Sequence, residues 1–224
     1  MGLVLNIIIS GLISGSVYAL LAIGFSLIFG VARIVNIAHT AFYMLAAYCI
    51  YVVTQKMGFH PIWGMAAAIV LVTVLGMVSY KVLINPIREH EGAVLIATIA
   101  LAMAFQEIMT LIFTGTYLSV PALIGGYFKL LGVKVFYQQL LTFCAALLIL
   151  VVLWAILMKT KLGLAIRSTA QDREVANLMG INEARVAMMT MGLSVGLAGF
   201  TGAIVVPLTI LEPGRKDGVR RKDS

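Results

Sequence analysis

The sequence predicts an all-α, polytopic membrane helix bundle, on the evidence of its composition and its recurring apolar runs. Of its 224 residues, 62% are hydrophobic and only 11% are charged, whereas soluble proteins have about 45–50% apolar and about 25% charged residues. So few polar side chains cannot cover a water-exposed surface. Soluble enzymes, nucleic-acid-binding modules and disordered linkers are therefore excluded. The net charge of +7 is interpreted as membrane-flanking charge, with no nucleic-acid partner.

Six stretches without Asp, Lys or Arg have a length near the roughly 20 residues that a helix needs to cross a bilayer core of about 30 Å. Their backbones must be helical, because lipid offers no hydrogen-bond partners. Four glycines in the first stretch, at positions 11, 15, 24 and 30, make a break or a tilt an expected outcome there. The stretches cover residues 5–32, 34–55, 62–80, 93–114, 136–158 and 186–211. We expect one transmembrane domain over residues 1–213 and a basic, disordered tail over 214–224.

The basic residues between the spans predict the orientation of the chain, since cytoplasmic loops carry an excess of Lys and Arg. The first, third and fifth loops hold most of them, and these loops are therefore expected in the cytoplasm. The basic tail after Gly214 does not fit this orientation, and its abrupt change of composition favours a shortened or frame-changed end. The odd loops hold Arg33, Lys81, Arg88, Lys159, Lys161, Arg167, Arg173 and Arg185, against Lys56, Lys129 and Lys134 in the others.

The first stretch carries a polar face, because hydroxyl and amide residues recur there every four positions. A ridge of small residues lies beside it, and small residues let membrane helices approach closely. Two interpretations stay open: a seam between helices, or a polar wall of a solute path. The polar face is Asn6, Ser10, Ser14 and Tyr18, and the ridge is Gly11, Gly15 and Ala19.

The second stretch opens with Asn36, His39, Thr40 and Tyr43, which share one helix face. Asn36 is expected to cap this helix by accepting from a free backbone N–H group. His39 lies about one turn inside the cytoplasmic edge. It is interpreted either as a hydrogen-bonded structural residue or as a proton carrier or ligand.

Glu107 is the only acid in any of the six stretches. Alanines at 93, 97, 100 and 104 precede it at helical spacing, and this pattern predicts a tight packing seam with one carboxyl group set into it. Acids inside membranes are costly and suggest a function. Glu107 is therefore either a structural, hydrogen-bonded acid or a residue of a transport path.

The fifth loop, residues 159–185, is long, charged and able to form a helix. Val175, Leu178, Met179 and Ile181 can share one face, with polar residues on the others, and Gly180 is expected to end the helix. Such an element could lie on lipid or dock into a groove of a partner. Acidic residues within it favour docking to a cytoplasmic protein. The polar positions are Asp172, Arg173, Glu174 and Asn177.

Residues in this loop resemble a known family. Glu174-Val175-Ala176, three further residues and Gly180 are similar to the E-A-A-x-x-x-G coupling motif of ABC-importer permeases. The block Gly15–Leu20 with Gly24, Gly30 and Asn36–His39, and the block Arg167–Asp172 with Ile181-Asn182, resemble branched-chain amino-acid permeases of the LivH kind. The resemblance runs from about residue 11 to about residue 213. Thr40 departs from it, since the family usually has glycine there.

The resemblance implies a membrane permease subunit of an ATP-driven importer for branched-chain or similar amino acids, in the bacterial inner membrane. Its expected partners are cytoplasmic ATP-binding subunits, a second permease subunit and a periplasmic solute-binding protein. Family members continue beyond this length, which again implies a shortened end. The residues expected to couple to the ATPases are Asp172, Arg173, Glu174, Ala176, Met179, Gly180 and Ile181. The translocation path or helix seam is expected at Ser10, Ser14, Tyr18, Asn36, His39, Tyr43 and Glu107.

Two other classes of function are weighed against this one. An ion-coupled secondary transporter would use Glu107 and the proton gradient instead of ATP. A membrane-embedded enzyme would need a nucleophile with a base, or a metal cluster, at one depth, and His39 has no carboxylate on its own helix face. We therefore expect no catalytic residue, no metal and no cofactor.

Overall fold

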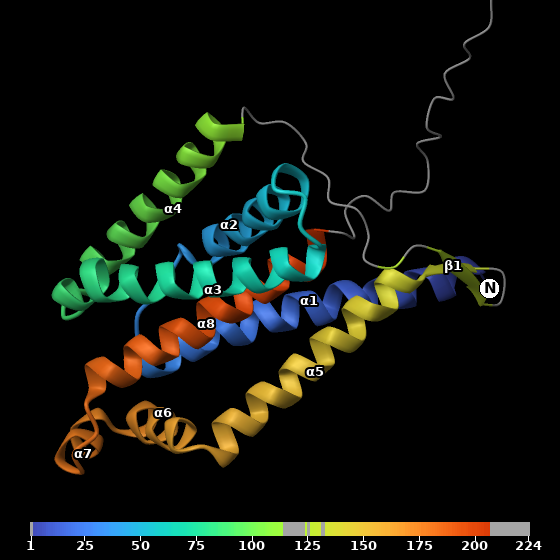
Figure 1. The fold of residues 1–224 in the computed structure, drawn as a ribbon. Coiled ribbons are helices and arrows are strands. Elements are labelled where there is room, and N and C mark those ends of the chain that lie inside the picture. Colours follow the sequence, from blue (N-terminus) through green and yellow to red (C-terminus); the bar gives the residue numbers. More distant parts are fainter. Residues whose placement is uncertain (1, 114–123, 125, 131–132, 207–224) are drawn as a thin grey trace, which may run out of the picture.

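The chain forms a bundle of helices, as Figure 1 shows for the computed structural model. The structure describes residues 2–113, 124, 126–130 and 133–206. This architecture confirms the predicted all-α, polytopic class. The helices are α1 (Gly2–Ala32), α2 (His39–Tyr51), α3 (Pro61–Ser79), α4 (Glu91–Phe113), α5 (Tyr137–Lys159), α6 (Lys161–Gln171), α7 (Arg173–Leu178) and α8 (Glu183–Val205).

Five of these helices are long and apolar enough to cross a membrane: α1, α3, α4, α5 and α8. Helix α2 has only 13 residues and continues as a π-helical turn, η1 (Val52–Lys56). It begins at His39, so the second span is shorter than the predicted stretch 34–55. Helix α3 likewise continues through η2 (Tyr80–Ile84) and η3 (Asn85–Ile87).

Helix α1 is continuous over 31 residues, and its glycines do not break it. Of the two outcomes expected for this stretch, a break or a tilt, the break is absent. A helix of this length is about 45 Å long at 1.5 Å per residue. This exceeds a hydrocarbon core of about 30 Å, which long helices accommodate by tilting.

Helix α8 is the centre of the bundle and packs against α1, α2 and α3. Two thirds of its apolar window is buried, against 6% of that of α4. Small residues make this packing possible: a Cβ added at Gly202 would lie 2.5 Å from the Tyr43 carbonyl oxygen, and one at Gly192 would lie 3.1 Å from Met77. The glycines of α8 therefore form a small-residue packing seam within the bundle.

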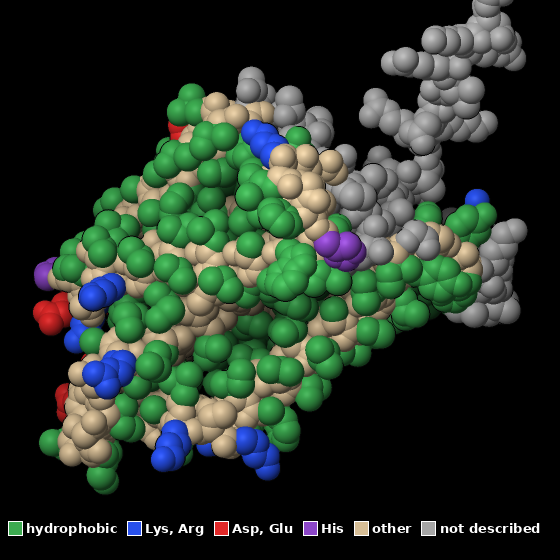
Figure 2. Space-filling model, viewed as in Figure 1, with side chains coloured by type: hydrophobic (Ala, Val, Ile, Leu, Met, Phe, Trp, Pro, Cys, Tyr) green, Lys and Arg blue, Asp and Glu red, His purple; other side chains and the backbone are tan. Residues whose placement is uncertain are grey.

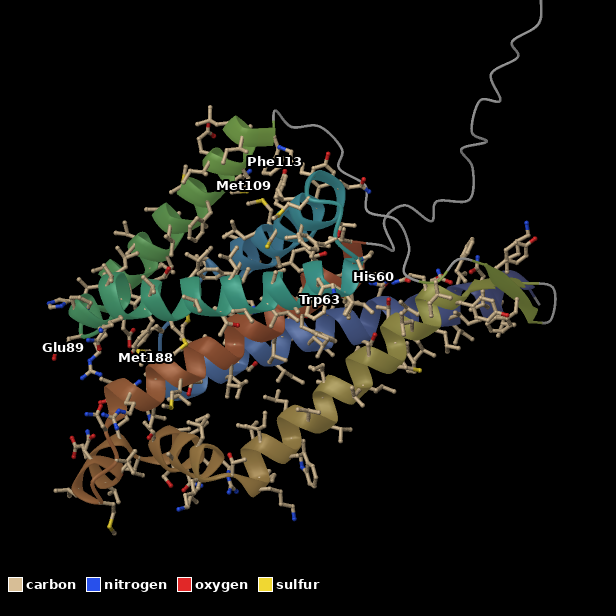
Figure 3. All side chains as sticks on the ribbon, in the orientation of Figure 1. His60, Trp63, Glu89, Met109, Phe113 and Met188 are labelled. Atoms are coloured by element: carbon tan, nitrogen blue, oxygen red, sulfur yellow. The ribbon has the colours of Figure 1, made fainter. Side chains whose placement is uncertain are left out.

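Helix α4 lies at the edge of the bundle and packs mainly on α2. Aromatic pairs join the two helices: the ring centroids of Phe42 and Phe105 are 5.5 Å apart, and those of Tyr48 and Phe113 are 4.6 Å apart. Phe113 and Met109 mark the end of α4 nearest to α2 in Figure 3. The alanine face predicted as a packing seam is not the one that contacts α2.

A β-hairpin of two short antiparallel strands, β1 (Tyr127–Leu130) and β2 (Val133–Phe136), precedes α5. It lies beside the N-terminal part of α1 (Figure 1). Phe128 and Val135 of the hairpin line an apolar hollow together with Ile9 and Leu12 of α1. This hairpin was not predicted from the sequence.

The loops predicted to be cytoplasmic lie at one end of the bundle. Lys and Arg side chains gather there on the face seen in Figure 2, around α6 and α7, while hydrophobic side chains cover most of the rest. The predicted basic tail over 214–224 lies outside the described residues, as do Pro207 and Pro213, which precede it.

Candidate functional site

The fifth loop folds into two helices with different roles. Thr160 begins α6, its hydroxyl accepting a hydrogen bond from the Gly163 N–H at 3.0 Å. One face of α6 packs against the bundle through Gly163, Ile166 and Thr169, which are buried. The short amphipathic helix expected before Gly180 is α7, which extends beyond the bundle, whereas α6 is a separate helix that docks on α1, α5 and α8 (Figure 1).

Asp172 separates the two helices and begins α7. Its carboxylate oxygen accepts hydrogen bonds from the N–H groups of Glu174 at 2.9 Å and Val175 at 3.1 Å. A carboxylate in this position satisfies backbone donors that a helix start leaves free. Asp172 is thus the N-terminal cap of α7, and the start of the helix fixes which face each later residue occupies. We call this cap and the turn at Gly180 the local framework of α7.

Gly180 ends α7 as predicted. Its φ is +83°, which glycine adopts without the steric cost that a Cβ would bring. Its N–H donates to the Asn177 carbonyl oxygen at 3.0 Å, and the Ile181 N–H donates to that of Ala176, also at 3.0 Å. These two bonds form the Schellman arrangement that commonly closes helices.

The outward face of α7 carries three apolar side chains and one acid: we call Val175, Leu178, Met179 and Glu174 the α7 surface. Leu178 is 87% exposed and Met179 is 79% exposed. Ala176 is buried and faces the bundle, three residues from Arg173, so these two share the inward face. Ile181 is half-buried among core residues, so its predicted place on the apolar face with Leu178 is wrong.

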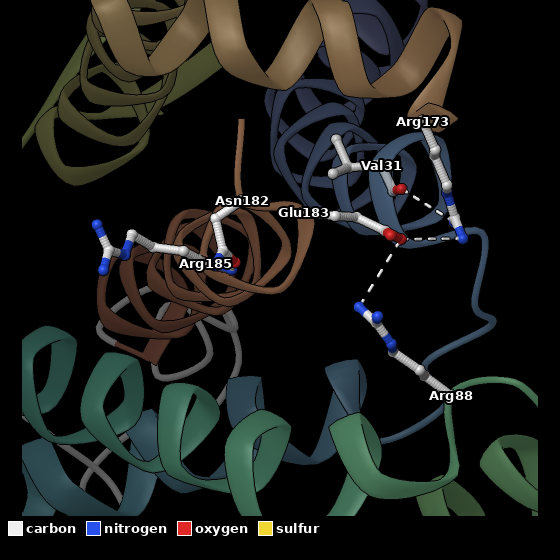
Figure 4. A network of polar contacts seen from close by, with 6 residues as sticks. All are labelled: Val31, Arg88, Arg173, Asn182, Glu183 and Arg185. Atoms are coloured by element: carbon white, nitrogen blue, oxygen red, sulfur yellow. Dashed lines mark hydrogen bonds and ion pairs between the residues drawn. The ribbon is translucent and has the colours of Figure 1, made fainter. Parts of the chain in front are cut away.

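Arg173 points into the bundle and joins three segments there (Figure 4). Its guanidinium donates to the Val31 carbonyl oxygen near the end of α1 at 3.0 Å and lies 3.2 Å from the Glu183 carboxylate. The same carboxylate oxygen lies 3.8 Å from Arg88, in the turn between α3 and α4. We call Arg88, Arg173 and Glu183 the charged triad.

The predicted polar face of α1 lies on the outside of this chain. Ser10, Ser14 and Tyr18 are exposed, and a Cβ added at Gly11 or Gly15 would meet no atom within 4 Å. A seam between helices of this chain is therefore not formed there. The small and polar residues of α1 are left facing whatever surrounds the chain.

Asn36 and His39 lie inside the bundle, against α8. Asn36 donates to the Met191 sulfur at 3.5 Å and does not cap α2, so that prediction is wrong. The loop 33–38 turns it inward before the helix begins. His39 Nδ1 lies 3.4 Å from the Ser194 hydroxyl, and its ring fills the space beside Gly24.

Tyr43 is half-buried on α2, whereas Tyr18 is exposed on α1. Glu107 is likewise exposed on α4, as are Ala93, Ala100 and Ala104. The packing seam predicted around Glu107 is therefore absent from the contacts of this chain.

Three residues of the site were not anticipated from the sequence: Ser194, Glu183 and Arg88. Ser194 is one hydroxyl within a glycine-rich stretch, where it signals only helix packing. Glu183 follows Asn182, whose side chain caps α8 by accepting from the Arg185 N–H at 3.0 Å, so an acid there suggests a helix start. Only the fold brings Arg88 to it.

Known proteins with similar sequences identify the family of this chain. A family model described as the permease component of branched-chain amino acid transport systems matches residues 7–219. The chain belongs to this family. It is a transport permease with several membrane helices, and its expected place in the inner membrane agrees with this family and with the five membrane-length helices.

Relatives of this permease carry matching names. It is 27% identical to BraD of Pseudomonas aeruginosa, a high-affinity branched-chain amino acid transport system permease protein, over 92% of this chain and 72% of that protein. It is also 27% identical to LivH of Escherichia coli K12, over 88% of this chain and 68% of LivH, and 26% identical to LivH of Salmonella typhimurium. No solved structure matches this permease significantly.

Proposed function

We propose that this permease is the membrane subunit of an ATP-driven importer and that α7 docks onto a cytoplasmic ATP-binding subunit. The α7 surface carries the proposal. Leu178 and Met179 are held at the tip of the bundle with most of their apolar area uncovered. Burying such side chains stabilises a complex, typically by about 25 cal/mol per Å² of apolar surface.

The local framework of α7 suits this role. The Asp172 cap and the Gly180 turn fix both ends of a helix only six residues long. Isolated helices of this length are unstable in water. A short helix fixed at both ends therefore presents its outward residues in one arrangement, which lowers the entropic cost of docking.

The exposed polar face of α1 indicates where the solute path could lie. Ser10, Ser14 and Tyr18 sit at membrane depth, where hydroxyl groups gain from a polar neighbour and gain nothing from lipid. We propose that this face meets a second permease subunit and that the path runs between the two. A periplasmic solute-binding protein would then deliver the amino acid at the opposite end from α7.

The proposed substrates are branched-chain or similar amino acids, and their class rests on the family and on the names of the relatives. Residues 1–213 would form one permease domain, with ATP hydrolysis carried out by the partner subunits. A permease without fixed charge on its exposed α1 face is compatible with a zwitterionic solute that has an aliphatic side chain.

Co-purification with the ATP-binding subunits tests the docking. Glu174→Arg and Gly180→Asp should each abolish association, because one reverses a charge on the α7 surface and the other forces a side chain into the left-handed turn at Gly180. Matched controls lie at the same end of the bundle, where Glu89 (labelled in Figure 3) and Gly92 are both exposed.

Glu89→Arg and Gly92→Asp repeat the same chemical changes away from α7 and should leave association intact. All four variants should insert into the membrane at the level of the unmodified permease. If Glu174→Arg and Gly180→Asp both retain the ATP-binding subunits, α7 is not the docking element.

A further inference from the structure

The charged triad links α7 to parts of the bundle that are distant in sequence. Arg173 and Val31 are 142 positions apart, yet the guanidinium donates to that carbonyl oxygen at 3.0 Å. Arg173 follows Asp172 directly, so the cap that begins α7 also aims this side chain inward. Its position in the helix thus separates it from the α7 surface, although it belongs to the stretch predicted to couple to the ATPases.

We propose that Arg173 is a positioning residue that transmits movement of α7 to α1, with Glu183 as the anchor that holds its guanidinium in place. This inference rests on the proposed docking of α7 and adds the route by which docking reaches the membrane helices. The route ends on α1, the helix whose outer face carries Ser10, Ser14 and Tyr18.

The contact with α1 uses a site where a cation is favoured. The last four carbonyl groups of a helix have no partner within that helix, and its C-terminal end carries a partial negative charge. Val31 is in the last turn of α1, one residue before its end at Ala32. The Arg173 guanidinium therefore supplies both a missing donor and a favourable charge, and the planar fork can hold Val31 and Glu183 together.

Glu183 is well placed to anchor this contact. It is the first residue of α8, so the partial positive charge at the start of that helix stabilises its carboxylate. Its side chain is only 16% exposed, and those of Arg173 and Arg88 are 29% and 33% exposed, so water screens the three charges less than it would at an open surface.

The path through Arg173 differs from the path along the backbone. Along the backbone, α7 connects forward through Gly180, Ile181 and Asn182 to α8, and back through Asp172 to α6, which docks on α1, α5 and α8. Neither backbone path reaches the end of α1 or the turn after α3 directly. The triad adds a side-chain connection to α1 and to the turn after α3, so one movement displaces all three.

The test compares the energy coupling of variants in the complete transporter, reconstituted with its ATP-binding subunits, second permease and binding protein. We expect Arg173→Gln to retain the ATP-binding subunits and to hydrolyse ATP while taking up about tenfold less amino acid per ATP, from the loss of one charged hydrogen-bonding group. Glu183→Gln should give the same loss. The double variant should be no worse than either, because the two residues act as one unit.

Arg185→Gln is the matched control. Arg185 lies two residues after Glu183 and is exposed, with its side chain directed away from the triad in Figure 4. It should keep normal uptake per ATP. Arg173→Lys provides a second variant for the case in which Arg173→Gln does not accumulate, since it keeps the charge and loses the planar fork.

A second readout separates transmission from a purely structural role. In a Ser14→Cys background, ATP should change the thiol labelling rate at position 14, and Arg173→Gln should remove that change. Equal uptake per ATP in Arg173→Gln and Arg185→Gln, or an unchanged ATP effect on labelling, would overturn the proposal. Loss of the ATP-binding subunits from Arg173→Gln would also overturn it, by placing Arg173 at the docking surface. The docking proposal fails separately, if Glu174→Arg and Gly180→Asp both retain them.

Discussion

The Ser194 hydroxyl donates a hydrogen bond of 2.6 Å to the Gly24 carbonyl oxygen, joining α8 to α1 across 170 positions of sequence. The glycine makes this approach possible, because a Cβ there would lie 3.0 Å from the His39 ring and 3.1 Å from the Ser194 carbonyl oxygen. Three helices therefore meet at one point inside the bundle. Hydrogen bonds and close contacts at this point hold together segments that lipid alone would not press against each other.

Ser194→Ala should lower the stability of the permease by about 1 kcal/mol, because one interhelical hydrogen bond is lost in an apolar environment. Thermal unfolding in detergent, followed by the reactivity of the half-buried Cys49 thiol, measures this. Ser26→Ala serves as the control, since Ser26 is exposed on α1. Equal melting temperatures for the two variants would show that the bond to Gly24 contributes nothing.

Gly202→Ala should destabilise the bundle by about 1–3 kcal/mol, the usual cost of overpacking a close contact. The added Cβ would meet the Tyr43 carbonyl oxygen at 2.5 Å, and a backbone atom cannot rotate away. Gly11→Ala makes the same change where nothing lies within 4 Å. The same unfolding assay should show a lower melting temperature for Gly202→Ala alone, and an equal effect in both variants would contradict the packing described for α8.

Ser14→Leu should reduce uptake by about tenfold or more without lowering the stability of the isolated permease. A leucine facing lipid is harmless, whereas one facing a polar path or a second subunit removes a hydroxyl and blocks space. Uptake by reconstituted transporter gives the measurement. Thr110→Leu, a comparable change on the exposed part of α4, should stay within about twofold of the unmodified transporter. Normal uptake with Ser14→Leu would place α1 against lipid.

Glu107→Gln should leave uptake within about twofold of normal and fully dependent on ATP. Among the described residues no ion pair to Glu107 occurs, so the neutral amide replaces an exposed acid and breaks no ion pair of these residues. Uptake measured with and without a proton gradient, at constant ATP, checks this. Uptake that survives ATP depletion and is uncoupled from the gradient by Glu107→Gln would instead support ion-coupled transport.

The sequence is most informative where the physics is local. Lipid forces each long apolar run into a helix, so the helices α1, α3, α4, α5 and α8 lie where the predicted spans do. The end of α7 at Gly180 was likewise predictable, since a left-handed residue after an amphipathic run favours glycine. Periodicity alone also put Val175, Leu178 and Met179 on one face.

What the sequence could not supply is which helix faces meet. Small residues are found both in packed seams and on exposed faces, so the ridge at Gly11 and the row of alanines before Glu107 look like the seam at Gly202 although only the last is packed. Asn36 has the residue type and position of a cap, yet its amide turns toward Met191. Arg88 and Glu183 are 95 positions apart, and nothing local pairs them.

The bundle is organised around α8, which the ribosome makes after the other helices that the structure describes. Helices α1, α2 and α3 all rest on α8, so they enter the membrane before their common partner exists. At a synthesis rate of about 5–20 residues per second, the roughly 120 residues from the end of η2 to the end of α8 take about 6–24 s. During that interval, the buried polar groups of Asn36 and His39 have no Ser194 or Met191 to meet. We therefore expect newly inserted chains to need these buried polar groups sheltered, for example by the insertion machinery, until α8 arrives.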